Sequence, residues 1–572
     1  MKMMNLTDIE AVKNTLCYQY ASDIVIGKIA AGKKVILACK RFLSDLEKSQ
    51  SLSFRWKFDV EKAYRPIRFM EQFLIPTKGD YSEMKLLPWE HFVEGNIYGW
   101  VDKETGLRRY NEALIIVGSG NGKSTLVSGN AIFGASKDGE RGAEIYLLAN
   151  SKDQAGIIYG ECAAQIQNNP RLRKHFRVLR NGIFYDKTGS KIERLATDSK
   201  KQDGRNVHLA VFDELQDYQS WKLINVIKAK TKKRKQPLVL YITTLGNEID
   251  GPLMDLYVLG DHLLNNEGEI NKRVSDRMFV YIAEIDEEDD PEDRTCWIKA
   301  NPSIGPLLTM ESLEDEWERC KLIPSERANF INKQLNVFTS VDELSMLDAQ
   351  TILKNNQTYD IEQLKGRVCY GGFDLSESQD FTSACLEFPL EDNRFFVLSH
   401  SWVPAKKVKE DHEKLDWDML ESQGYLTIVP GDYVDYNLIY EWFEAQNKKY
   451  VIDKVGYDPA KAYLLVQQMQ AAGYPMDVVR QGELTLTAPL DHLVEIFLDG
   501  GIVTNNDPLY RWYLSNVKLA KRGPNATYLP TKQNKYRKID GFAAHLDAHV
   551  VYLRNNPVTA DGNRDIATVI SL

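Results

Sequence analysis

Residues 117–125, Val-Gly-Ser-Gly-Asn-Gly-Lys-Ser-Thr, combine small residues, a lysine and hydroxyls in the order of a phosphate-binding loop. The apolar run 113–117 predicts a strand before the loop, and a helix is expected to begin near the lysine. Backbone N–H groups of such a loop surround phosphate oxygens, Lys123 can reach the β- and γ-phosphates, and the Ser124 hydroxyl can bind Mg²⁺. The sequence therefore predicts a nucleoside triphosphatase. The expected nucleotide contacts are Gly118, Ser119, Gly120, Asn121, Gly122, Lys123, Ser124 and Thr125.

A second apolar run, 209–212, ends on two adjacent carboxylates, Asp213 and Glu214. Buried parallel strands read as apolar runs, and the carboxyl ends of such strands carry the chemistry of open α/β sheets. Asp213 is expected to hold the Mg²⁺ through water, and Glu214 to polarise the water that attacks the γ-phosphate. In the phosphate-binding loop, Val117 replaces the first glycine of the usual pattern. Either motif alone is better explained by an ordinary strand followed by a turn or by solvated acids. Their order and spacing together favour an ATPase.

Three further acids, Asp374, Asp458 and Asp540, stand at the ends of expected elements in the C-terminal half. Asp374 and Asp458 each follow an apolar run, and Asp540 opens an expected helix. Carboxylates from separate elements can bind two Mg²⁺ or Mn²⁺ ions, which activate water and stabilise the leaving oxygen of a phosphodiester. The trio predicts a nuclease, with Asp380 and Asp547 as additional candidate ligands. Each acid alone is equally well explained by a helix cap, a turn or a surface position.

The chain has 572 residues, of which 43% are hydrophobic and 27% charged, and this composition predicts two or three globular domains. No apolar stretch approaches the roughly 20 residues that a bilayer span requires, so a soluble intracellular protein is expected. The seven cysteines form no Cys-x-x-Cys pair, which argues against zinc and against a disulfide framework. Because the net charge is −9, nucleic-acid binding must depend on local patches, and the basic runs 228–235 and 518–538 are candidates.

Short apolar runs alternate with longer amphipathic stretches after residue 113, which predicts βαβ units and a parallel sheet. We expect a boundary between Val341 and Gly366, and we expect the domain on each side of it to fold by itself. The expected segments are an N-terminal helical segment 1–100, the ATPase core 101–250, a helical linker subdomain 251–345 and a second α/β domain 365–555.

The combination of ATPase motifs and strand-end acids resembles the large terminase subunit of tailed bacteriophages. Trp89 and Glu90 lie in a segment similar to the adenine-side motif of that family, with Glu90 where glutamine is expected. Residues 243–246 resemble its coupling motif, which links ATP hydrolysis to movement. Other segments similar to the family are 297–302, 334–336, 372–376 with Asp380, and 538–541.

This resemblance implies a P-loop NTPase domain with a parallel sheet, followed by an RNase H-like nuclease domain. It implies ATP and Mg²⁺ at the first site and two Mg²⁺ or Mn²⁺ ions at the second. The implied activities are ATP-driven translocation of double-stranded viral DNA into a procapsid and cleavage of concatemeric DNA in the host cytoplasm. The implied partners are viral DNA, a small terminase subunit, the portal protein and further copies of the chain in a ring.

Two other functions remain open from the sequence. A helicase-like or repair ATPase fused to a nuclease would need helicase motifs between Thr244 and Val341, where none is found. A DNA-bridging scaffold with one inactive half is disfavoured because both sets of acids are intact. The loop also lacks the Arg or Lys that terminase loops commonly carry before Asn-Gly-Lys-Ser. Stabilisation of the transferring phosphoryl group would then fall to another arginine, for which Arg205 and a residue of a neighbouring subunit are candidates.

Overall fold

The computed structural model divides into two compact units, residues 1–339 and 340–572. Ser376 and Lys535, which belong to segments singled out in the sequence, lie outside the described residues. All seven cysteines are buried and none forms a disulfide. In the part of the chain that the structure describes, no helix is long and apolar enough to cross a membrane. The described residues are 6–77, 83–196, 204–246, 251–265, 272–338, 345–375, 380–413, 415–460, 462–522, 527–532 and 536–556.

The first unit is built on an eight-stranded sheet with the order β10-β3-β9-β8-β4-β7-β6-β5. The pairings from β10 to β7 are all parallel, and β6 and β5 extend the edge as an antiparallel hairpin. The predicted parallel sheet is therefore confirmed. The strands are β3 (Glu112–Ile116), β4 (Glu144–Ala149), β5 (Phe176–Leu179), β6 (Gly182–Tyr185), β7 (Ser190–Ala196), β8 (Val207–Asp213), β9 (Leu238–Thr243) and β10 (Met278–Ile282).

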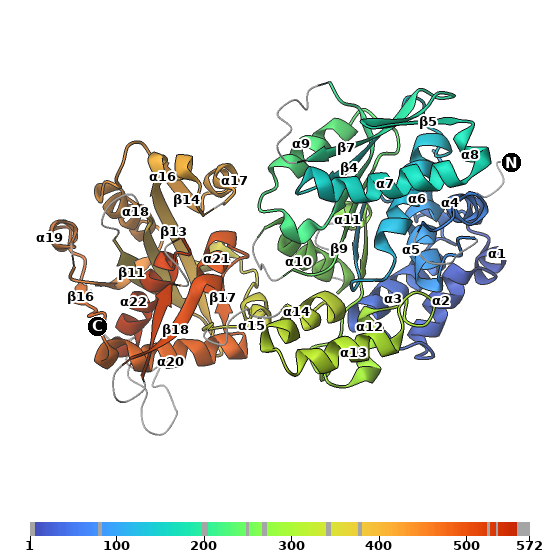
Figure 1. Cartoon of the computed structure of the whole chain (residues 1–572). Helices are drawn as coiled ribbons and strands as arrows, with labels where there is room; N and C mark the ends of the chain where they lie inside the picture. Colours follow the sequence, from blue (N-terminus) through green and yellow to red (C-terminus); the bar gives the residue numbers. More distant parts are fainter. Residues whose placement is uncertain are drawn as a thin grey trace. The chain divides into compact units, whose positions relative to one another are not determined.

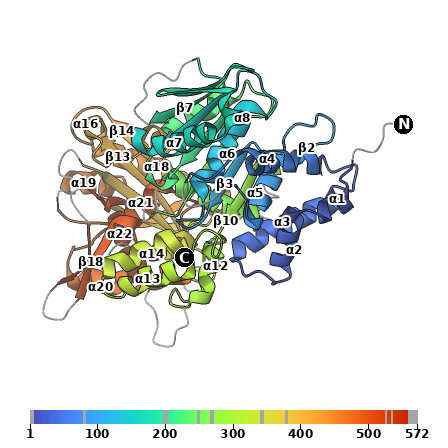
Figure 2. The same cartoon turned by 45° about the vertical axis from the view of Figure 1, so that its right-hand side comes forward.

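Helices α6 and α7 pack on β4 and β7, and α9 packs on β8. The segment before the sheet is a group of helices closed by a short β1–β2 ladder, and Figure 2 shows α1, α2 and α3 lying together in it. The elements are α1 (Ile9–Lys13), α2 (Leu16–Val25), α3 (Lys33–Lys48), β1 (Trp56–Phe58), α4 (Val60–Phe73), α5 (Pro88–Gly99), β2 (Trp100–Asp102), α6 (Lys123–Ser136), α7 (Lys152–Asn168), α8 (Pro170–Arg173), η1 (Leu215–Asp217), α9 (Lys222–Thr231), α10 (Pro252–Leu264) and α11 (Lys272–Ser275).

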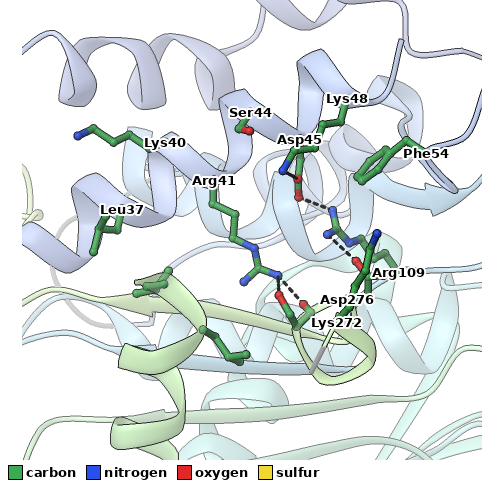
Figure 3. Close-up of a pocket in the computed structure, with 13 residues that line it drawn as sticks. Leu37, Lys40, Arg41, Ser44, Asp45, Lys48, Phe54, Arg109, Lys272 and Asp276 are labelled. Atoms are coloured by element: carbon green, nitrogen blue, oxygen red, sulfur yellow. Dashed lines mark hydrogen bonds and ion pairs between the residues drawn. The ribbon is translucent and has the colours of Figure 1, made fainter. Parts of the chain in front are cut away.

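Two arginines connect α3 by hydrogen bonds to residues 275–276, which precede β10. Both arginines line a pocket of about 500 Å³ (Figure 3). Arg109 is 3% exposed and donates to Asp45 at 2.7 Å and to Asp276 at 2.9 Å. Arg41 donates to the carbonyl oxygen and the hydroxyl of Ser275. Because removing one partner of a buried ion pair leaves an uncompensated charge, these bonds hold the N-terminal helices firmly on the sheet.

The segment 251–345 was expected to be a helical linker, but it also supplies β10, an edge strand of the sheet. A five-residue apolar run such as Met278–Ile282 fits a buried helix as well as a strand, so its periodicity alone does not identify it. The rest of the segment packs α12, α13 and α14 around Trp297, Trp317 and Phe330, and these helices lie together in Figure 1. They are η3 (Arg294–Cys296), α12 (Trp297–Ala300), α13 (Met310–Cys320) and α14 (Pro324–Leu335).

The second unit contains a seven-stranded sheet with the order β14-β13-β12-β11-β15-β16, and β17 pairs with β13. Strands β11, β12 and β13 are antiparallel, whereas β15 and β16 run parallel to β11. The elements are α15 (Ala349–Lys354), η4 (Ile361–Leu364), β11 (Val368–Asp374), β12 (Thr382–Pro389), β13 (Phe395–Pro404), α16 (Ala405–Glu410), α17 (Trp417–Ser422), β14 (Leu426–Val429), α18 (Asn437–Asn447), β15 (Val451–Tyr457), α19 (Tyr463–Ala471), β16 (Met476–Val478), α20 (Glu483–Asp499), β17 (Ile502–Val503), α21 (Pro508–Asn516), β18 (Val517–Arg522), β19 (Thr527–Lys532) and α22 (Asp540–Asn555).

Helix α22 crosses β11 and β15 at two glycines, where the strands leave no room for a side chain. A Cβ at Gly372 would lie 2.1 Å from the Ala544 carbonyl oxygen, and one at Gly456 would lie 2.4 Å from that of Asp547. Real Cβ contacts are not this short, so the glycines are required by the close approach of the helix. This approach brings the acids of α22 to the strands that end in Asp374 and Tyr457.

The second unit includes residues before the predicted start at 365. Asn355, at the end of α15 and 1% exposed, donates to the carbonyl oxygen of Phe497 and accepts from the N–H of Ile502, at 2.7 and 2.8 Å. Tyr359 and Leu364 pack into the core of the same unit. The stretch between Val341 and Gly366 is thus not a simple linker, because most of its described part packs on the second sheet.

We expect a fragment of residues 340–572 to fold alone and to melt in one cooperative transition, because its sheet and its core are complete. The matched fragment 365–572 should be less stable, since loss of Asn355 removes the partner of the buried Ile502 N–H, at about 1–3 kcal/mol, and one of the two donors to the Phe497 carbonyl oxygen. Thermal unfolding followed by circular dichroism measures both. Equal stability of the two fragments would show that the α15 contacts are dispensable.

Candidate functional site

The phosphate-binding loop connects β3 to α6, and two of its glycines adopt backbone conformations that other residues avoid. Gly120 has φ 79° and Gly122 has φ 86°, and α6 begins directly afterwards at Lys123. The N–H of Gly118 donates to the Ala300 carbonyl oxygen at 3.0 Å, and that of Ser119 to the Lys333 carbonyl oxygen at 2.8 Å. These two N–H groups are engaged within the protein. The cradle for a phosphate must therefore come from residues 120–125.

The segment around α12 holds this loop from outside. The Asn121 side chain is fully buried, donates to Asn301 Oδ1 at 2.7 Å and accepts from the N–H of Ser303 at 3.0 Å. A Cβ at Gly118 would lie 2.2 Å from the same Asn301 oxygen. Asn121, expected to contact nucleotide, thus has its side chain committed to positioning the loop. The segment 297–302 that resembles the terminase family has a visible structural role here.

Lys123 lies folded over its own loop, with Nζ donating to the carbonyl oxygens of Val117 and Gly118, both at 2.9 Å. Burial lowers the pKa of Lys123 to about 8, although the charges of Glu214 and Asp213 oppose this shift. The lysine and the two acids therefore act on one another electrostatically. A buried ammonium of this kind is stabilised by an anion, which is what a phosphate supplies.

The two acids after β8 face the loop because β9 alone separates β8 from β3 in the sheet. Burial and, after it, the charge of Glu214 raise the pKa of Asp213 to about 7, although the charge of Lys123 opposes them. Glu214 has left-handed backbone angles, φ 51° and ψ 53°. Such angles are costly for a residue other than glycine and turn its side chain away from the line of the strand.

Trp89 and Glu90 lie at the start of α5. Trp89 is 1% exposed, donates to Ser303 Oγ at 2.9 Å and stacks on Tyr281, so its ring is part of the core. Glu90 Oε2 accepts the N–H of Leu87, and its Oε1 lies 3.8 Å from the position of a Cβ on Gly122. Burial raises the pKa of Glu90 to about 8. At neutral pH it is mostly the carboxylic acid, which offers a donor and an acceptor as glutamine does.

Arg205 does not lie at the nucleotide site. It precedes β8, whereas Asp213 ends that strand, so the two are roughly 25 Å apart at about 3.3 Å per residue. Its guanidinium pairs with Glu193 at 3.5 Å and stacks over Tyr146. The hypothesis that Arg205 stabilises the transferring phosphoryl group is therefore wrong for this conformation of the chain.

In the second unit, Asp374 and Asp458 occupy matching positions on adjoining parallel strands. Phe373 pairs with Tyr457, and each acid is the next residue along its strand. Neighbouring strands lie about 4.8 Å apart, so the two carboxylates leave the same edge of the sheet side by side. Asp540 opens α22 as predicted, and burial together with the charges of Asp374 and Asp380 raises its pKa.

The two additional candidates differ in their surroundings. Asp547 is 2% exposed and accepts from Gln481 Nε2 at 2.9 Å, and burial together with the charges of Asp374 and Asp458 raises its pKa. Asp380 instead accepts from Lys538 Nζ at 2.6 Å. Within the described residues, no three His, Cys, Asp or Glu side chains are close enough to hold one metal ion. The acids are spread along the sheet edge and not gathered around one point.

The first basic run is partly internal. Lys228 pairs with Glu112 at 2.8 Å, and Arg234 donates to the Arg141 carbonyl oxygen at 2.8 Å. Lys232, Lys233 and Lys235 are exposed. In the second run, Lys538 bonds to Asp380, one of the additional candidate ligands.

Sequence reasoning missed the amide side chains that support both sites. They include Gln216 beside Glu214, Asn301 beside the phosphate-binding loop and Gln481 beside Asp547. Only Gln216 is close in sequence to the acid that it contacts. The others are 66 or more residues from their partners, and no spacing pattern marks them.

Comparison with known proteins matches both halves of the chain to one family. Residues 88–259 match the terminase large subunit ATPase domain, and residues 272–554 match the terminase large subunit endonuclease domain. The terminase large subunit of Lactococcus phage p2 is 22% identical over 526 residues, covering 88% of this chain and 94% of that protein. Protein YmfN of Escherichia coli (strain K12) is 27% identical over 359 residues, covering 60% of this chain and 77% of that protein.

Among solved structures, the HK97 bacteriophage large terminase is similar to this chain, with 20% sequence identity and a TM-score of 0.47. The alignment covers 86% of this chain and 99% of the HK97 protein. The predicted fold class, a P-loop domain with a parallel sheet followed by an RNase H-like nuclease domain, is confirmed by the two family matches and by the sheets described above.

We expect Asp374→Ala, Asp458→Ala and Asp540→Ala each to abolish DNA cleavage, because loss of one carboxylate from a two-metal site misplaces or releases a metal. Asp547→Asn and Asp380→Asn should lose about 10- to 100-fold if they act behind the ligands. Plasmid cleavage in Mn²⁺ measures all five. Phosphate release from ATP is the control and should stay near the wild-type rate. Full cleavage by any of the first three variants would remove that residue from the ligand set.

Proposed function

The chain belongs to the terminase large subunit family, with an ATPase domain and an endonuclease domain, and we propose that these activities reside at the two sites described above. In this family the enzyme is an ATP-driven DNA-packaging motor and an endonuclease. The single observation that carries the residue assignment is that the functional side chains gather at the carboxyl ends of parallel strands: the phosphate-binding loop after β3 with the acids after β8 in the first sheet, and Asp374 with Asp458 in the second. Ligands bind there in open α/β sheets.

In the ATPase domain, residues 120–125 form the phosphate cradle, and Lys123 leaves its loop carbonyls to contact the β- and γ-phosphates. The hydroxyl of Ser124 and the carboxylate of Asp213 are hard oxygen donors that suit Mg²⁺ and would hold it. When bound, Mg²⁺ neutralises charge between the β- and γ-phosphates. Glu90 lies beside Gly122 of the cradle, and we assign it to the nucleotide because its segment resembles the adenine-side motif of the family.

Glu214 is the general base of this site, because it follows the strand that carries Asp213 and shares its electrostatic environment with Lys123. Its carboxylate orients and polarises the water that attacks the γ-phosphate. The described residues place no arginine in hydrogen-bond contact with the loop residues 118–125. We therefore assign the stabilising cation to a neighbouring subunit in a ring.

In the nuclease domain, Asp374, Asp458 and Asp540 would hold two Mg²⁺ or Mn²⁺ ions. The fit rests on Asp374 and Asp458, which follow one another's register on adjoining strands, and on Asp540 of α22, whose charge acts on Asp374. Because no three of the described acids surround one point, each ion would be held by a different subset of the three carboxylates. Divalent ions at this edge would supply activation of water and stabilisation of the leaving 3′-oxygen. Lys538, paired with Asp380, places a positive charge next to Asp540, where a DNA phosphate approaches.

We further propose that the chain acts in the host cytoplasm on double-stranded viral DNA. A small terminase subunit delivers the DNA, the portal of the procapsid receives it, and several copies of the chain form a ring. These partners are what membership of the family suggests. Exposed lysines of the 228–235 run are available for phosphate contacts on the motor.

The test of this function is a paired assay on the purified full chain. We expect ATP hydrolysis that DNA stimulates, and cleavage of plasmid DNA in Mn²⁺ without ATP. A helicase-like or repair ATPase would instead separate the strands of a partial duplex. Strand separation in ATP, with no translocation on intact duplex, would favour that alternative.

We expect Lys123→Ala to abolish ATP hydrolysis, because the β/γ charge that develops in the transition state loses its compensating ammonium. Plasmid cleavage in Mn²⁺ should persist, since the nuclease has its own sheet and its own acids. Phosphate release and nicking are measured on the same preparation. Wild-type turnover in this variant would place the nucleotide elsewhere.

A further inference from the structure

The side chain of Gln216 joins the ends of two strands in the ATPase sheet. It lies in η1, two residues after Glu214, and its Nε2 donates to Glu214 Oε2 at 2.5 Å. Its Oε1 accepts from the hydroxyl of Thr243, the last residue of β9. One amide therefore contacts the carboxylate after β8 and the hydroxyl at the end of β9.

The orientation of this amide is fixed by chemistry. A carboxylate only accepts hydrogen bonds, so the end of the amide that faces Glu214 must be the NH₂ group. The oxygen then faces Thr243, whose hydroxyl can donate. The reverse orientation would place two acceptors against each other at Glu214.

The loop after β9 packs directly on Gln216. A Cβ at Gly246 would lie 2.5 Å from Gln216 Cβ and 3.1 Å from Gln216 Cγ, so only glycine allows this contact. The loop is in turn held by α14, because Asn332 Nδ2 donates to the Gly246 carbonyl oxygen at 2.7 Å. Leu245 N–H also donates to Asn336 Oδ1 at 3.0 Å. Gln216 is thus fixed by a buried loop on the side away from Glu214.

Glu214 needs such support because its backbone conformation is unfavourable. Left-handed angles at a residue other than glycine persist only where the surroundings hold them. The bond from Gln216 is a charge-assisted hydrogen bond, which is stronger and more directional than a neutral one. It fixes which way the carboxylate points.

We propose that Gln216 is the positioning residue of Glu214, holding the carboxylate in the orientation that activates water and linking that orientation to the loop 243–246. This inference rests on the proposed role of Glu214 as general base. Through Gln216, the loop 243–246, which resembles the coupling motif, is connected by hydrogen bonds to the carboxylate that would activate the water.

The first test is Gln216→Met, which keeps the length of the side chain and removes both hydrogen bonds. We expect kcat for ATP hydrolysis to fall about 10- to 100-fold, as for a catalytic group displaced by about 1 Å, while KM for ATP changes little. The control is Gln219→Met in the same loop, whose side chain is exposed and should leave both constants unchanged. Wild-type kcat in Gln216→Met would overturn the proposal.

The second test asks whether Gln216 acts through Glu214. If it does, the double variant Glu214→Gln with Gln216→Met should be no slower than Glu214→Gln alone, because the carboxylate that Gln216 positions is already gone. Multiplied losses would assign Gln216 a separate role and overturn the proposal. Wild-type turnover in Glu214→Gln alone would instead refute the proposed function of the site.

Gln216→Glu decides the question if Gln216→Met does not fold. This variant keeps an oxygen for Thr243 but replaces the NH₂ donor by a second carboxylate, which has no proton to donate and repels Glu214. We expect kcat to fall at least as far as the roughly 10- to 100-fold given for Gln216→Met, with little change in KM. Wild-type kcat in Gln216→Glu would overturn the proposal.

Discussion

Parallel pairing of strands is the constraint on which both sites depend. In the first unit it aligns the ends of β3, β9 and β8, so that the phosphate-binding loop, the loop 243–246 and Asp213 leave one edge of the sheet. In the second unit it aligns β11 with β15 and places Asp374 beside Asp458. Like charges placed side by side cost free energy unless a cation compensates them. The sheet therefore creates the electrostatic demand that Lys123 meets in the first site and that divalent ions would meet in the second.

Helices complete each site by approaching the backbone more closely than a side chain would allow. Gly372 and Gly456 let α22 lie against β11 and β15, and this contact sets the positions of Asp540 and Asp547. Gly118 similarly allows Asn301 to reach the phosphate-binding loop. Glycine in the interior of a strand or at a loop costs conformational entropy, so its use here reflects a geometric requirement.

The sequence predicted what depends on local pattern. Strand ends at Asp213 and Asp374 and the start of α22 at Asp540 follow from apolar runs and from the residues that end them. Strand β10 was not recognised because five apolar residues fit more than one element. The candidate role of Arg205 failed because closeness in sequence to Asp213 hides the length of the strand that separates them. Partners such as Gln481 and Asp547 meet only after folding, so no single-sequence pattern reveals them.

Helix α14 contacts both loops that flank the nucleotide site. Its Lys333 carbonyl oxygen accepts the N–H of Ser119, and its Asn332 side chain donates to the Gly246 carbonyl oxygen. Asn332 is 1% exposed, so a displacement of the loop would leave a buried polar group unpaired at about 1–3 kcal/mol. Neither loop can therefore shift without losing a bond to α14, and the phosphate-binding loop would also lose its bonds to Ala300 and Asn301. The two loops are thus held together by the helices that pack around Trp297 and Phe330.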